Sequence, residues 1–171
     1  PQGDVYKRQP PNNSTTGTLL IFPNQSQRAV SMPEKALKRY EPGNLCSFRR
    51  IKFSTLSKDE KVVYVGNSDA KNSVIVAFDL KNGKLINKRI FFDGNNLGKT
   101  RNGLFDGLKV HSSGVVFATG PGGVLLIDEE ANHLGTIMPG KSTANCGFDS
   151  NEEYLYLTST DVLARIKLKK Q

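Results

Sequence analysis

The chain has 171 residues, of which 37% are hydrophobic, and no apolar stretch approaches the 18 or so residues of a membrane-spanning helix. Its net charge of +8 is uneven, because residues 1–52 hold nine Lys/Arg and three Asp/Glu, whereas residues 53–171 hold fifteen and thirteen. A nucleic-acid face requires basic residues interleaved with aromatic ones, whereas the basic residues here are scattered. We therefore expect binding to neither nucleic acid nor membrane.

The N-terminal third carries the least pattern. Residues 1–9 begin with Pro and lack the apolar core of a signal peptide, so we interpret them as a non-native scar of sequence assembly. Residues 10–50 are irregular, with a short strand expected at 18–22 and a short helix at 32–40. The two cysteines, Cys46 and Cys146, have no metal-ligand spacing, which favours buried or incidental thiols over a disulfide.

A repeat begins at residue 51. Three segments each show a strand, a polar turn, a strand that bears an aromatic residue, a loop and an apolar strand. The aromatic residue recurs at Tyr64, Phe117 and Tyr156. The first two segments continue into a fourth strand, over 84–92 and 133–138. Frequent turn pairs favour short strands over helices: Asn82-Gly83, Asp93-Gly94, Asn102-Gly103, Asp106-Gly107 and Gly122-Gly123.

Four short antiparallel strands every 40 to 50 residues are typical of propeller blades. The sequence therefore predicts an all-β fold and a β-propeller, with a β-sandwich as the alternative. Known propellers have four to eight blades, whereas about three to four are visible here. We expect residues 51–171 to be C-terminal blades and residues 10–50 to be a corrupted remnant of a preceding blade.

Several stretches carry a resemblance to a known family: Ser57–Asp69, Ala77–Asp79, Arg101–Val110, Val116–Val124, Leu134–Ile137 and Leu155–Leu168. From Ser57 to Lys169 the chain resembles the senescence marker protein/gluconolactonase/luciferin-regenerating family of six-bladed propellers. The run Ala118-Thr-Gly-Pro-Gly-Gly123 is similar to bacterial gluconolactonase-like members. Because no targeting signal is readable, the bacterial cytoplasm and the periplasm both stay open.

This resemblance implies hydrolysis of a sugar lactone with one divalent cation on the propeller axis. Calcium is the first expectation, with zinc, magnesium or manganese as alternatives, and oxygen ligands suit such a cation. The family's catalytic aspartate lies in a Pro-Asp-Gly turn, which here reads Phe105-Asp106-Gly107. Asp106 is thus the expected metal ligand and part of the water activation. The alternative is a solvated turn aspartate, which is common before Gly.

Two departures from the family pattern matter. The family's metal-binding asparagine lies in a Pro-Asn-Gly turn, whose place is held here by Ile51-Lys52-Phe53. A lysine cannot coordinate a cation and would repel it. The family's metal-binding glutamate belongs to the first blade, which these segments do not include. We hypothesise that residues 24–54 are partly corrupted, and we expect the chain as written to be inactive.

Weaker candidates for axial or substrate-binding residues are Asn67, Asp69 and Asn145. Asn67 and Asp69 are expected in a loop after the first aromatic strand, and Asn145 just before the first strand of the third segment. We interpret His111 and His133 as surface or turn residues without a catalytic partner. The run Gly120–Gly123 lacks the Lys-Ser/Thr of a phosphate loop and predicts a β-turn.

The leading interpretation is therefore a lactone hydrolase of carbohydrate metabolism, whose partner is a small sugar lactone. The alternative is a non-enzymatic propeller that binds a partner on its faces, or an inactive fragment. Fold alone does not decide between them, because propellers host many functions. The sequence leaves the oligomeric state open.

Overall fold

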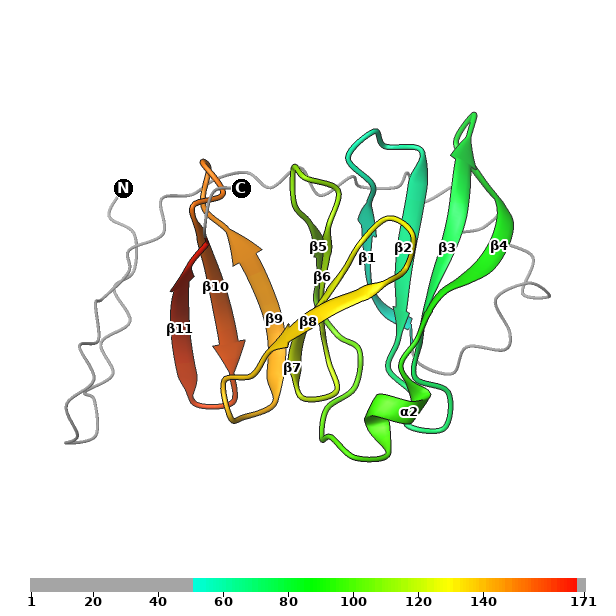
Figure 1. Ribbon diagram of the computed structural model, residues 1–171. Coiled ribbons are helices and arrows are strands. Elements are labelled where there is room, and N and C mark those ends of the chain that lie inside the picture. Colours follow the sequence, from blue (N-terminus) through cyan, green and yellow to red (C-terminus); the bar gives the residue numbers. More distant parts are fainter. Residues whose placement is uncertain (1–50, 169–171) are drawn as a thin grey trace, which may run out of the picture. The chain divides into compact units, whose positions relative to one another are not determined.

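The computed structural model describes residues 51–168, with side chains from residue 53 onward. The described residues all belong to one compact unit. They form three antiparallel sheets and one short helix (Figure 1). The strand predicted at 18–22 and the helix predicted at 32–40 lie outside the described residues.

Each sheet has its strands in sequence order, as in a meander. The first sheet comprises β1 (Ile51–Leu56), β2 (Val62–Asn67), β3 (Val74–Lys81) and β4 (Lys84–Asp93). The second comprises β5 (Leu108–Val110), β6 (Val116–Gly120), β7 (Gly123–Ile127) and β8 (His133–Ile137). The third comprises β9 (Thr143–Phe148), β10 (Tyr154–Ser159) and β11 (Val162–Lys167). One short helix, α2 (Asn95–Gly98), was not predicted from the sequence.

The first strands of the three sheets lie next to one another. Strand β5 contacts β1 on one side and β9 on the other. Adjacent first strands are the arrangement of propeller blades around an axis. The all-β propeller prediction is thereby confirmed, as are the predicted fourth strands β4 and β8, and the Gly120–Gly123 turn between β6 and β7.

Apolar side chains join neighbouring sheets. Between the first and second sheets, Tyr64, Ile75 and Ala77 share one buried cluster with Phe105 and Leu108. A second cluster joins the second sheet to the third, with Phe117, Val124, Cys146, Leu155 and Leu157. Both faces of the second sheet are thus buried, which explains the nearly continuous apolar runs in β6 and β7. In the described part of the chain, no helix is long and apolar enough to cross a membrane.

The Cys146 thiol provides a probe of this packing. Burial raises its pKa to about 12, and the side chain is a free thiol in the second cluster. In a Cys46→Ser variant, we expect Cys146 to react with a thiol reagent at pH 8 only after unfolding in denaturant. Because the folded pKa is raised, this thiol favours folding below about pH 9, and that contribution is lost as the pH rises toward 12. Rapid labelling of the native variant would contradict this.

Gly120 provides a second probe, since a Cβ atom there would lie 2.8 Å from ring carbons of Phe105 and 3.2 Å from Leu125 Cδ1. We expect Gly120→Ala to lower the free energy of unfolding by about 1–3 kcal/mol, measured by urea denaturation. Gly135→Ala is the matched control, because nothing lies within 4 Å of a Cβ at this strand position. Equal stability of the two variants would show that the packing around Phe105 is loose.

Candidate functional site

Asp106 lies in the connection that leads into β5. Backbone hydrogen bonds join this connection to β6 and to β9. The N–H of Asp106 donates to Thr119 O of β6 at 3.1 Å, and the next N–H, of Gly107, donates to Ala144 O of β9 at 3.0 Å. The side chain is half-buried, with its Oδ1 atom fully buried. The position of this carboxylate is thus set by backbone hydrogen bonds to two sheets.

Phe105, which precedes Asp106, anchors the connection in the core. Its side chain is 0% exposed and belongs to the cluster between the first and second sheets. Phe92 contacts the ring edge-on, with a centroid distance of 6.3 Å. Gly94 and Gly120 border the ring so closely that a Cβ atom at either position would come within 2.8 Å of it. These contacts fix the place of Phe105, the residue directly before Asp106.

Thr119 supports the same connection from β6. The side chain is fully buried, and its Oγ1 lies 3.2 Å from both Gly107 O and Ala144 O. One hydroxyl proton can serve either carbonyl, so this group joins the beginning of β5 to β9. Thr119 is not among the residues predicted from the sequence, since one threonine in a strand carries no signal of this role.

The three sheets place equivalent residues at this level of the axis. The hairpin after each first strand begins at Ser57, His111 or Asp149, whose N–H donates back across the hairpin. Counting back five residues from each gives Lys52, Asp106 and Ala144. The strand register supports the match between Lys52 and Asp106. Lys52 lies at a bulge between Ile51 and Phe53. The second sheet is irregular at the same place, because Asp106 and Gly107 both bond to one residue, Thr119. The structure therefore places Lys52 and Asp106 at equivalent positions of neighbouring blades.

Asn145 lies beside this connection, although the prediction that it precedes the strand is wrong. It lies inside β9, which begins at Thr143, two residues before Asn145. Its Oδ1 accepts a hydrogen bond from Cys146 N–H at 2.9 Å, and its side chain fills the space next to Gly107. Asn145 thus lies against Gly107, the residue that follows Asp106.

Asn67 and Asp69 do not join this group. Asn67 is the last residue of β2 and not a loop residue, and strand alternation places it on the face of Val63 and Val65. That face is opposite to Gly66, which lies against Phe105 and Leu108. Asn67 Nδ2 donates to Asn72 O at 2.8 Å, and Asp69 Oδ1 accepts from Lys71 N–H at 3.0 Å. Both residues therefore stabilise their own loop.

The donors at this level suit a hard cation only in part. Asp106 offers a carboxylate, and the Asn145 amide oxygen keeps one lone pair beyond its bond to Cys146. Within residues 51–168 no three His, Cys, Asp or Glu side chains form a group that could hold a metal. Asp106 thus offers one carboxylate, and within residues 51–168 it belongs to no group of three such side chains.

The histidines differ in their surroundings. His133 is exposed, as expected, and lies at the start of β8 with Nε2 2.9 Å from Thr136 Oγ1. His111 lies in the turn after β5, also as expected, but it contacts both Ser113 and Glu152. His111 therefore has side-chain partners in the fold that its sequence neighbourhood does not reveal. Glu152 is 41 residues away in the sequence, so only the fold brings the two together.

Comparisons with known proteins agree with this architecture. A gluconolactonase of Zymomonas mobilis is 29% identical over 174 residues, which covers 98% of this chain and 48% of that protein. The crystal structure of a gluconolactonase from Xanthomonas campestris superposes with a TM-score of 0.62 at 27% identity, over 70% of this chain and 38% of that one. This chain thus spans about half the length of the curated relative.

A more distant structure shares the fold. A calcium-binding regucalcin from Agrobacterium tumefaciens has a TM-score of 0.55 and 20% identity, over 67% of this chain and 39% of that one. The model of the SMP-30/Gluconolactonase/LRE-like region matches residues 54–161, which include all of the second sheet and the Asp106 connection. The chain belongs to the SMP-30/gluconolactonase/LRE-like family.

Proposed function

We propose that this chain carries the Asp106 part of a metal-dependent hydrolase of sugar lactones. The observation that supports this most is the position of Asp106 just before a first strand, where its own N–H bonds to β6 and the N–H of Gly107 bonds to β9. The similarity to two gluconolactonases supports the substrate class. Calcium is the proposed cation, by analogy with the calcium-binding regucalcin neighbour.

The chemistry assigned to Asp106 follows from its position. A divalent cation, when bound, polarises the carbonyl of the lactone. Asp106 would hold that cation through one carboxylate oxygen and accept the proton of the attacking water. The attack opens the ring by breaking the bond between the acyl carbon and the ring oxygen. The backbone bonds of Asp106 and Gly107 keep the carboxylate oriented, so that little reorganisation is needed during the reaction.

Lys52 favours a second candidate, a non-enzymatic propeller that binds a partner. At the position equivalent to Asp106 in the first sheet, the chain has a basic residue in place of an oxygen donor. A cation at the axis would meet an unfavourable charge there. We therefore expect the chain with Lys52 to bind calcium weakly and to hydrolyse lactones slowly.

Replacing Lys52 tests both candidates. We expect Lys52→Asn, which supplies an amide oxygen, to tighten calcium binding in a calorimetric titration and to accelerate the hydrolysis of D-glucono-1,5-lactone, followed by acid release. Adding Asp106→Asn to this variant should reverse both effects and lower the rate by about 100-fold or more. Asp69→Asn is the control, since Asp69 lies in a separate loop. If Lys52→Asn gains neither property, the binding module is favoured.

Thr119 tests the positioning of Asp106. Thr119→Val removes the hydroxyl that joins Gly107 O and Ala144 O and keeps a similar shape. We expect a loss of about 1 kcal/mol in the free energy of unfolding, together with weaker calcium binding in the Lys52→Asn background. Thr158→Val is the matched control, because its exposed hydroxyl bonds only to Asn145 O among the described residues, at 3.3 Å. Equal effects of the two variants would show that the buried hydroxyl does not position the site.

A further inference from the structure

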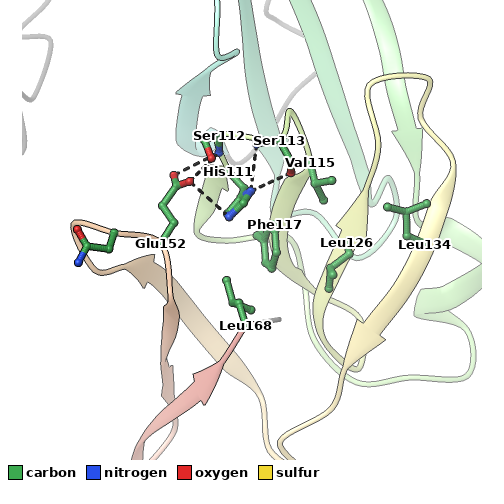
Figure 2. Close-up of a pocket in the computed structure, with 10 residues that line it drawn as sticks. His111, Ser112, Ser113, Val115, Phe117, Leu126, Leu134, Glu152 and Leu168 are labelled. Atoms are coloured by element: carbon green, nitrogen blue, oxygen red, sulfur yellow. Dashed lines mark hydrogen bonds and ion pairs between the residues drawn. The ribbon is translucent and has the colours of Figure 1, made fainter. Parts of the chain in front are cut away.

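A second group of polar side chains lies at the other end of β5. Asp106 comes just before this strand and His111 just after it. There a pocket of about 520 Å³ opens between the second and third sheets (Figure 2). Its polar side includes His111, Ser113 and Glu152, and its apolar lining comprises Val115, Phe117, Leu126, Leu134 and Leu168. The proposed lactone chemistry uses none of these residues.

His111 lies between a hydroxyl and a carboxylate. Its Nδ1 is 2.8 Å from Ser113 Oγ, and its Nε2 is 3.4 Å from Glu152 Oε2. Figure 2 shows the ring between these two side chains, with Phe117 and Leu168 below it. A serine, a histidine and a carboxylate in this order form the arrangement that activates a serine for attack on a carbonyl.

A backbone hydrogen bond determines which ring nitrogen of His111 carries the proton. The N–H of Ser113 donates to Nδ1 at 3.1 Å. Since a backbone N–H can only donate, Nδ1 must present its lone pair, and the proton of the neutral ring lies on Nε2, toward Glu152. The Ser113 hydroxyl, at 2.8 Å, shares this one lone pair with the Ser113 N–H in a three-centre hydrogen bond. A neutral ring with its proton on Nε2 is the protonation state that a general base for Ser113 requires.

The imidazole and the carboxylate are both held in place. Ser112 N–H donates to Glu152, at 3.0 Å from Oε2 and 3.2 Å from Oε1. The ring of His111 packs edge-on against Phe148, with a centroid distance of 5.3 Å, and at 6.0 Å from Phe117. His111 and Glu152 retain only 22% and 27% of their side-chain exposure. The group is therefore ordered but open to the pocket.

We propose that this pocket is a second site, which hydrolyses esters of small apolar carboxylic acids through Ser113. Ser113 Oγ is the nucleophile, His111 is the general base, and Glu152 is a positioning residue that orients the ring. The apolar lining receives the acyl chain. Because no charged group of the lining other than Glu152 faces the acyl site, neutral esters are preferred.

The reaction needs only the ester and water. Ser113 Oγ bonds to the carbonyl carbon while its proton passes to His111 Nδ1, which releases the Ser113 N–H from that nitrogen. The carbon–alkoxy bond then breaks, and the leaving alcohol takes the proton from Nδ1. Water next attacks the acyl carbon as Nδ1 accepts its proton, and the bond to Oγ breaks. Oγ recovers the proton, and the products are one carboxylic acid and one alcohol.

The test uses the 171-residue chain in EDTA, with p-nitrophenyl butyrate as the substrate and a fluorophosphonate as the serine label. We expect slow hydrolysis and covalent labelling of the native protein. Ser113→Ala should lose the labelling and reduce hydrolysis to the background rate. Ser150→Ala is the matched control, because Ser150 occupies the corresponding turn of the third sheet and is exposed. The EDTA removes divalent cations, so hydrolysis and labelling that persist in it are separate from metal-dependent lactone hydrolysis.

The neighbouring residues sharpen the test. His111→Gln should lower hydrolysis by about 100-fold. Glu152→Gln should lower kcat by at least about tenfold with KM unchanged, whereas a purely structural role would not produce that split. Glu60→Gln is its control, since Glu60 has the same turn position and a similar φ, 58° against 53°. Absence of labelling in the folded wild-type chain, or full activity of Ser113→Ala, would overturn the proposal.

Discussion

The packing of Phe105 is the constraint on which the arrangement of the sheets depends. The ring is fully buried where the first and second sheets meet, and glycines at 94 and 120 leave room for it. A side chain at either glycine would displace the ring. Phe105 directly precedes Asp106 in the sequence. One aromatic contact therefore determines how closely two sheets approach and where the carboxylate lies. The hydrogen bonds of Thr119 then extend the same constraint to the third sheet.

Much of the fold could be predicted from the sequence because each sheet repeats one local pattern. The aromatic residues at Tyr64, Phe117 and Tyr156 mark the second strands β2, β6 and β10, and turn residues mark the hairpins. The limits of the strands were harder to predict. Strand β9 begins at Thr143, ahead of its apolar residues, because Thr143 and Asn145 pair with Ser159 and Thr158 of β10. Helix α2 carries no apolar period, so no sequence signal distinguishes it from a loop.

The candidate sites were less predictable, since their residues meet only through the fold. The turn motif singles out Asp106, and Asn145 lies against the following residue, Gly107. Strand alternation gives Asn67 a different direction, which a pattern of polar residues after a strand does not reveal. His111 and Glu152 come together because the turns of two adjacent sheets lie side by side. Nothing local in either turn marks the other as its neighbour.

The contact between Gly107 and Asn145 has a consequence for how such a ring can change its sequence. The two residues hold the same position in neighbouring sheets. Each lies four positions before the residue that begins its hairpin, His111 or Asp149. A Cβ atom at Gly107 would overlap the amide of Asn145, so the space there is already occupied. Around the axis, then, side-chain volume is shared between blades, and a residue can grow in one blade only where its neighbour shrinks.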